Sequence, residues 1–197
     1  FNIDVFSEFG EFSNRIILSK DIQRELYVSG FSEQESVAKL DSSDFALIIT
    51  TNATANSHFA IRPLVGDKTH IYGGDQFNHR LIKIEKSSMT DNVFVSTYGS
   101  LGTGTTNFDR IYQIAMDDDF LYVCDFGNQR VKVHRKSDLS FVRSFGTLGQ
   151  NATSFHNLTG CAVDERYLYL AQDGNYRIQK VEKSTFAFVT SLLLLIL

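Results

Sequence analysis

Short apolar runs alternate with polar turns along this chain, and the pattern recurs about every 47 residues. The runs are rich in β-branched and aromatic side chains, and Gly, Asp, Asn and Ser separate them, which is typical of strands joined by tight turns. No apolar period of 3.6 residues extends over a useful length, so helices are not expected. The best copies predict strands at Ile111–Met116, Leu121-Tyr122-Val123, 130–134 and Phe141–Phe145, and at Leu158–Val163, 168–170, 177–181 and 186–189.

Four short antiparallel strands in each repeat of this length predict an all-β fold, a β-propeller of four-stranded antiparallel blades. We expect one propeller region over residues 1–197, with blades at about 16–50, 61–99, 111–146 and 158–192. Residues 1–10 align with a fourth strand and are expected to be the outer strand of another blade, while residues 192–197 form an apolar tail.

Several polar positions keep one register through the repeats. Each repeat has a tyrosine anchor, and in three of them an Asp precedes the tyrosine by five residues while an Asn and an Arg follow it by six and eight. In chain order these residues are Tyr27, Tyr72, Tyr122 and Tyr169; Asp67, Asp117 and Asp164; Asn78, Asn128 and Asn175; Arg80, Arg130 and Arg177. The first repeat is degenerate, because Glu33 and Glu35 replace its Asn and Arg.

The segments that carry these positions are DQFNHRL from Asp75, DFGNQRV from Asp125 and GNYRI from Gly174. They resemble the NHL repeat, specifically over residues 70–190 and weakly over 1–60. The third segment departs slightly, since its acidic residue, Asp173, lies two rather than three positions before the Asn. The resemblance implies propeller blades and, in a typical member, a six-bladed ring.

The recurring residues are expected to be architectural rather than catalytic. An Asp or Asn at a turn can accept hydrogen bonds from nearby backbone N–H groups, and an Arg can reach a carboxylate or carbonyl on the neighbouring strand. We therefore predict a structural role for Asp75, Asn78, Arg80, Asp125, Asn128, Arg130, Asn175 and Arg177.

Four blades and one extra strand do not close a ring neatly. Two further blades beyond this chain or from another subunit, and a four-bladed ring, are the alternatives. An unpaired edge strand can pair with another chain. If the run from Leu192 to Leu197 is such a strand, it would pair with another copy, so a homo-oligomer or polymer is one expectation. A membrane is expected as a partner only if the apolar run continues beyond residue 197.

Charge and cysteine content narrow the partners. The net charge is −4 and both signs are mixed along the chain, so no basic face is expected and nucleic acid is an unlikely partner. Cys124 and Cys161 are too few for a disulfide framework and are expected to be buried free thiols.

Candidate chemistry is sparse, and we predict no catalytic residue and no cofactor. The five histidines have no short metal-ligand spacing. His58 and His156 lie near first-strand entrances and are weak candidates for a channel metal. NHL-type peptidyl-amidating lyases have a similar layout, so a metal-dependent lyase with a channel Zn or Ca ion remains an alternative. Asp117-Asp118-Asp119 could bind Ca²⁺, but a solvated hairpin turn is the favoured interpretation.

Three N-glycosylation sequons begin at Asn52, Asn151 and Asn157, all in or beside connections between blades. Their placement favours an extracellular or cell-surface location. The function expected is a non-enzymatic binding or structural module that acts through protein or glycan contacts and through self-assembly by edge-strand pairing. The alternatives are the lyase and, with less support, an RNA-binding NHL domain.

Overall fold

The computed structural model describes residues 19–20, 25–29, 37–41, 47–51, 61–88 and 96–194 of the chain, with side chains described for residues 61, 63–87 and 96–194. The extra strand predicted at residues 1–10 lies outside these ranges. The chain divides into two compact units, residues 1–97 and residues 98–197, which are described separately.

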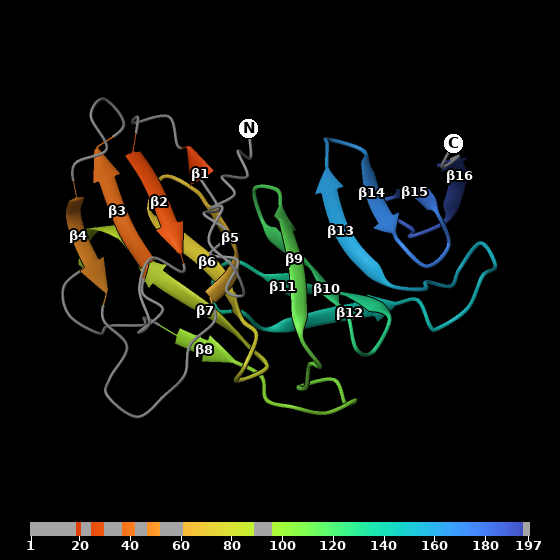
Figure 1. The fold of residues 1–197 in the computed structure, drawn as a ribbon, viewed down its shortest axis with the longest axis horizontal. Helices are drawn as coiled ribbons and strands as arrows, with labels where there is room; N and C mark the ends of the chain where they lie inside the picture. Colours follow the sequence, from red (N-terminus) through yellow and green to blue (C-terminus); the bar gives the residue numbers. More distant parts are fainter. Residues whose placement is uncertain are drawn as a thin grey trace, which may run out of the picture. The chain divides into compact units, whose positions relative to one another are not determined.

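The first unit contains two four-stranded sheets in which strands follow one another in chain order (Figure 1). The first sheet consists of β1 (Ser19–Lys20), β2 (Glu25–Ser29), β3 (Val37–Asp41) and β4 (Leu47–Thr51). The second consists of β5 (Ile61–Gly66), β6 (His70–Asp75), β7 (Arg80–Glu85) and β8 (Ser96–Tyr98), with a 3₁₀ turn, η1 (Lys86–Ser88), after β7. Strand β8 leads the chain into the second unit.

The second unit repeats this arrangement in two antiparallel sheets. Blade 3 consists of β9 (Ile111–Met116), β10 (Phe120–Asp125), β11 (Arg130–Arg135) and β12 (Phe141–Phe145). Blade 4 consists of β13 (Leu158–Val163), β14 (Tyr167–Gln172), β15 (Arg177–Glu182) and β16 (Phe188–Leu193). The described ranges contain no α-helix, and so no helix in them could cross a bilayer.

Left-handed residues set the turns. In the turns before β7, β11 and β15, the residue between the Asn and the Arg has a positive φ: His79 at 51°, Gln129 at 50° and Tyr176 at 47°. Phe186, at φ 59°, has this conformation in the turn after β15. A strand cannot include such a residue, because extended backbone requires a negative φ. The fourth strand of blade 4 therefore begins at Phe188 and not at the predicted residue 186.

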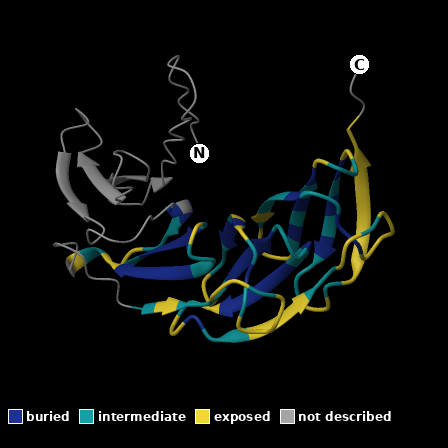
Figure 2. Cartoon of the chain, turned by 60° about the horizontal axis from the view of Figure 1, so that its bottom comes forward, coloured by how far each residue is buried: buried dark blue, intermediate teal, exposed yellow. Residues whose placement is uncertain are grey.

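The described core of the second unit lies between blades 3 and 4. Tyr122, Cys124, Val131 and Val133 of blade 3 belong to one buried cluster with Leu158, Leu168, Leu170 and Val181 of blade 4, together with Ala115 and Phe155. Both faces of β10 and β11 are buried, whereas β14 and β15 alternate between buried and partly exposed side chains and every residue of β16 is exposed. Figure 2 shows this contrast, with β16 in yellow.

Candidate functional site

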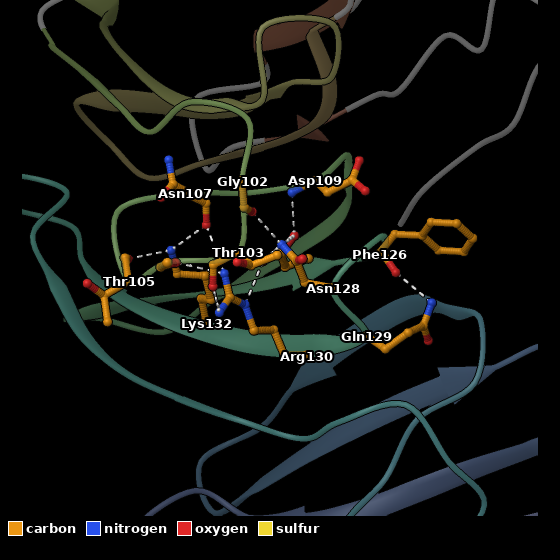
Figure 3. A network of polar contacts seen from close by, with 12 residues as sticks. Gly102, Thr103, Thr105, Asn107, Asp109, Phe126, Asn128, Gln129, Arg130 and Lys132 are labelled. Atoms are coloured by element: carbon orange, nitrogen blue, oxygen red, sulfur yellow. Dashed lines mark hydrogen bonds and ion pairs between the residues drawn. The ribbon is translucent and has the colours of Figure 1, made fainter.

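The turn between β10 and β11 is organised around the carboxylate of Asp125, which is fully buried. Arg130 donates from Nε to one carboxylate oxygen at 2.7 Å, and the Asn128 amide donates to the same oxygen at 2.9 Å. The backbone N–H of Asp109, in the loop before β9, donates to the other oxygen at 2.7 Å. The motif Asp thus joins its own turn to the loop that enters its blade (Figure 3).

The cations of blade 3 hold this entering loop through its carbonyl groups. The guanidinium of Arg130 donates to the carbonyls of Thr103, Gly104 and Asn107 at 2.7–3.0 Å. The ammonium group of Lys132 donates to the carbonyls of Thr105 and Asn107 at 2.7 and 2.9 Å. These bonds satisfy polar backbone groups of a loop that has no regular partner strand.

Burial shifts the pKa values of Asp125 and Lys132 in this network. Burial raises the pKa of the Asp125 carboxyl, although the N–H of Asp109, Asn128 and Arg130 favour its ionised form. Burial, with the nearby charge of Arg130, lowers the pKa of Lys132 to about 8. Lys132 Nζ also lies 3.9 Å from the centre of the Phe108 ring, which stabilises its cationic form. The fully buried His134 beside it has its pKa lowered to about 4, chiefly by burial.

Blade 4 contains the same network with a neutral acceptor. The position of Asp125 is taken by Gln172, whose amide oxygen accepts hydrogen bonds from Asn175 at 2.7 Å and from Nε of Arg177 at 3.4 Å. Asn175 also donates to the carbonyl of Gly149, and Arg177 to those of Gln150, Asn151 and Ser154. The sequence motif predicted an acidic residue at this position and therefore pointed to Asp173. The acceptor is Gln172, which the motif missed because it is an amide.

The sheet β5–β8, here called blade 2, has the local contacts of this network. Nε of Arg80 donates to Asp75 at 2.9 Å, and the side chain of Asn78 donates to both oxygens of the same carboxylate. All eight predicted motif residues therefore lie at the turns before β7, β11 and β15, where their described contacts are with backbone and side chains of turns and loops.

A second turn type recurs at the opposite ends of these strands. Asp67, Asp117 and Asp164 each accept backbone hydrogen bonds from the residues two and three positions later. Each also accepts a hydrogen bond from the tyrosine hydroxyl five positions later, at 2.8–3.2 Å. This bond explains the constant spacing between the Asp and the anchoring tyrosine, a reason that the sequence pattern alone did not supply.

Two of these turns border a hollow of about 480 Å³ between blades 3 and 4. Its lining consists of Met116, Asp117, Asp118, Asp119, Phe120, Val163, Asp164, Glu165 and Lys183. The ammonium group of Lys183 contacts Asp117 at 2.8 Å and donates to the carbonyl of Asp164 at 3.1 Å, so it links the two blades. Burial opposes the ionised form of Asp117, but hydrogen bonds from Lys183, Tyr122 and backbone N–H groups lower its pKa overall.

Three carboxylates of the hollow differ from Asp117. Asp118, Asp119 and Glu165 are exposed, and their carboxylates make no ion pair or hydrogen bond with the residues that the structure describes. Lys183, the cation of the lining, is already engaged by Asp117. The hollow therefore presents an excess of negative charge to solvent.

The other predicted site residues are dispersed. His58 and Asn52 lie outside the described residues. His156 is half-buried, and its ring covers Gly174, where an added Cβ would lie 2.6 Å from the ring. Within the described ranges, no group of three or more His, Cys, Asp or Glu side chains is arranged to hold a metal ion.

The two described sequon asparagines differ in accessibility. Asn151 is exposed, and its amide oxygen accepts hydrogen bonds from the backbone and hydroxyl of Thr153 at 2.9 and 3.0 Å. Asn157 is half-buried and has a left-handed φ of 53°. Asn151 is thus the more accessible of the two.

Known structures share this fold. The chain is similar to BamB from Moraxella catarrhalis, with a TM-score of 0.60 and 11% identity over 91% of this chain and 54% of that one. It is also similar to glutaminyl cyclase from Myxococcus xanthus, with a TM-score of 0.59 and 11% identity over 90% of this chain and 69% of that one. Both are β-propellers, so the predicted fold class is confirmed. At this identity the likeness shows the fold alone, and the chain spans about half the length of the first neighbour.

Sequence comparisons give no further assignment. No protein-family model matches the chain, and no curated protein matches it. The structural neighbours support a β-propeller fold and do not identify the type of repeat.

Proposed function

We propose that this chain is a non-enzymatic binding module of NHL-type blades, and that the hollow between blades 3 and 4 binds a basic segment of a partner protein. The observation that carries the proposal is the set of three exposed carboxylates in the hollow, Asp118, Asp119 and Glu165, which make no ion pair with the residues that the structure describes. The eight motif residues are occupied in turns, which leaves the loops as the binding surface.

The electrostatics favour a cationic ligand of extended shape. A cleft lined by one sign of charge concentrates counter-ions and raises the association rate of an oppositely charged partner. Phe120 and Val163 add apolar lining next to the carboxylates. A lysine or arginine side chain fits this combination, because its aliphatic stem covers apolar surface while its charged end reaches a carboxylate.

The direct experiment uses a fluorescent peptide of alternating Arg and Ser residues, with anisotropy as the measurement. The triple variant Asp118→Asn, Asp119→Asn, Glu165→Gln is expected to bind roughly tenfold more weakly, since each exposed charge contributes about 0.2–1 kcal/mol. Asp173→Asn is the matched control for Asp118→Asn, because it removes one exposed carboxylate from the turn at the other end of the strands. Equal losses from Asp118→Asn and Asp173→Asn would contradict the proposal.

Self-assembly is a second proposal, and one feature of blade 4 supports it. Phe188, Val189, Leu192 and Leu193 of β16 are 39–66% exposed, and the strand carries no charge. Charged residues on edge strands normally discourage pairing with other chains. Sedimentation at high protein concentration, with and without residues 192–197, tests it, and monomers in both cases would reject it.

The remaining alternatives have separate tests. An extracellular location and occupied sequons predict a mass increase at Asn151 after secretion from eukaryotic cells. A glycan partner predicts binding to immobilised glycans that the triple variant does not affect. The amidating-lyase alternative predicts bound metal by elemental measurement, and the RNA-binding alternative predicts RNA retention at low salt.

A further inference from the structure

The two cysteines of the chain lie on facing strands of neighbouring blades. Side chains alternate along a strand, so Cys124 shares a face of β10 with Tyr122, and both belong to the cluster between blades 3 and 4. Cys161, on β13, packs against this cluster together with Val163. Both thiols therefore point into the same interface from opposite sides.

Contacts of the thiols place them next to each other. The thiol of Cys161 donates to the carbonyl of Tyr122 at 3.4 Å, which brings it to β10 two residues from Cys124. Strands β10 and β13 contact each other, and both cysteines lie at or against the cluster between them. Cys124 is fully buried, and Cys161 is partly exposed.

The repeat itself does not require cysteine at either position. Ala171 is the counterpart of Cys124 in blade 4, and Ile114 is the counterpart of Cys161 in blade 3. Two isolated departures from the repeat, the only cysteines in the chain, meet at one point of the blade interface.

We propose that Cys124 and Cys161 are a modification site that takes a small disulfide as oxidant and becomes a disulfide joining β10 to β13. In the first step the Cys161 thiolate attacks one sulfur of a disulfide such as oxidised glutathione, whose S–S bond breaks and releases one thiolate. In the second step the Cys124 thiolate attacks the Cys161 sulfur and releases the other glutathione thiolate. The protein loses two protons and two electrons, and the oxidant becomes two thiols.

The surroundings determine which step is slow. Burial raises the pKa of the Cys124 thiol, and the neighbouring Cys161 adds to this rise. Because the thiolate is the nucleophile, the second step is slow at neutral pH and accelerates as the pH rises. The partly exposed Cys161 is the sulfur that a small oxidant reaches first.

The disulfide would join two blades through residues 37 positions apart in the chain. Closing a loop of this size restricts the unfolded state, so the oxidised protein should melt roughly 5–15 °C higher than the reduced protein. This consequence concerns the blade interface and does not depend on what the acidic hollow binds.

The test treats the whole folded chain with oxidised glutathione at pH 7 and at pH 8.5. The proposal predicts a monomer lighter by two hydrogen atoms, a peptide pair joining Cys124 to Cys161 under non-reducing conditions, faster formation at pH 8.5, and a higher Tm that a reductant reverses. Cys124→Ala, which installs the residue of blade 4, should keep the fold and stop at a stable glutathione adduct on Cys161, with no rise in Tm.

Two results would overturn the proposal. One is a wild-type protein that stays folded and ends as the same glutathione adduct as Cys124→Ala. The other is a disulfide between two chains in place of the one within a chain. If Cys124→Ala fails to fold, Cys161→Ala provides the second control, because it should take up no glutathione and show no Tm rise.

Discussion

Blades 3 and 4 hold their entering loops through arginines at equivalent positions, Arg130 and Arg177, but the residues that flank these arginines differ. In blade 3 the arginine lies between the buried carboxylate of Asp125 and the buried ammonium group of Lys132. In blade 4 the two flanking positions are the neutral amides Gln172 and Gln179, both buried. The formal charge of each trio is +1, since the Asp and Lys charges cancel.

This difference shows which part of the network the loop requires. Arg130 and Arg177 each donate to three loop carbonyls, and Asn128 and Asn175 each donate to one. The carboxylate and the ammonium group are replaced together, so they behave as a pair whose charges compensate inside the blade. A buried carboxylate without its cation would carry a large desolvation cost.

The largest effect is expected from removing the arginines. Arg130→Ala leaves the Asp125 carboxylate buried without its ion-pair partner and should lower the free energy of unfolding by about 3–5 kcal/mol. Arg177→Ala leaves neutral acceptors and should lower it by about 1–3 kcal/mol. Urea unfolding of both variants measures the difference, and an equal or reversed order would show that the carboxylate is not the deciding group.

Introducing the glutamines of blade 4 into blade 3 distinguishes the coupling between Asp125 and Lys132 from the separate contribution of each residue. Asp125→Gln alone leaves Arg130 and Lys132 without a carboxylate, and Lys132→Gln alone removes the charge that supports ionised Asp125. The double variant restores the arrangement of blade 4 and should be more stable than the sum of the single effects by about 1–3 kcal/mol. A double-mutant cycle in urea measures this coupling energy, and strict additivity would refute the pairing.

The pH dependence of Lys132 gives a finer comparison. Its pKa in the folded chain is about 8, below the ordinary value of 10.5, so between these pH values the unfolded chain binds more protons. The free energy of unfolding of the wild type should therefore rise relative to Lys132→Gln by about 1–3 kcal/mol from pH 7 to pH 10. Thermal or urea unfolding of the two proteins at both pH values supplies the test, and a constant difference would place Lys132 in contact with water.

A smaller effect is expected where Lys183 joins the blades. The pKa of Asp117 is lowered in the folded chain, so its stabilising contribution is present above pH 4 and is lost as the pH falls through the folded value. Asp117→Asn should cost about 1 kcal/mol at pH 6 and progressively less towards pH 3. Unfolding curves at these pH values measure the change, and a cost that grows at low pH would have the wrong sign.

The repeat pattern in the sequence predicted the strands and turns within each blade, but it did not predict the contacts between neighbouring blades. The strands of blades 3 and 4 followed from alternating apolar runs and turn residues, although β10 and β14 are longer than predicted. Strand β16 differs most, because it begins after the left-handed Phe186 and continues to Leu193, into the predicted apolar tail. Gln172 was missed because the pattern sought an acidic residue, and an amide oxygen accepts the same hydrogen bonds.

The hollow and the thiol pair could not be predicted for a different reason. Asp118 and Glu165 lie 47 positions apart, and they share one hollow only because consecutive blades pack side by side. Cys124 and Cys161 belong to different repeats, and the prediction of two buried free thiols is wrong for Cys161, which is only partly buried. Their proximity follows from the packing of β10 against β13, which no local pattern specifies.

The central claim is that the chain binds through the acidic hollow and that the recurrent motif is architectural. Hydrogen exchange of the wild-type chain with and without the Arg-Ser peptide tests it most directly. We expect added protection at residues 117–120 and 164–167 and none in the turns at 125–130 and 172–177. Protection confined to those motif turns, or no change at peptide concentrations that saturate the anisotropy signal, would contradict the account.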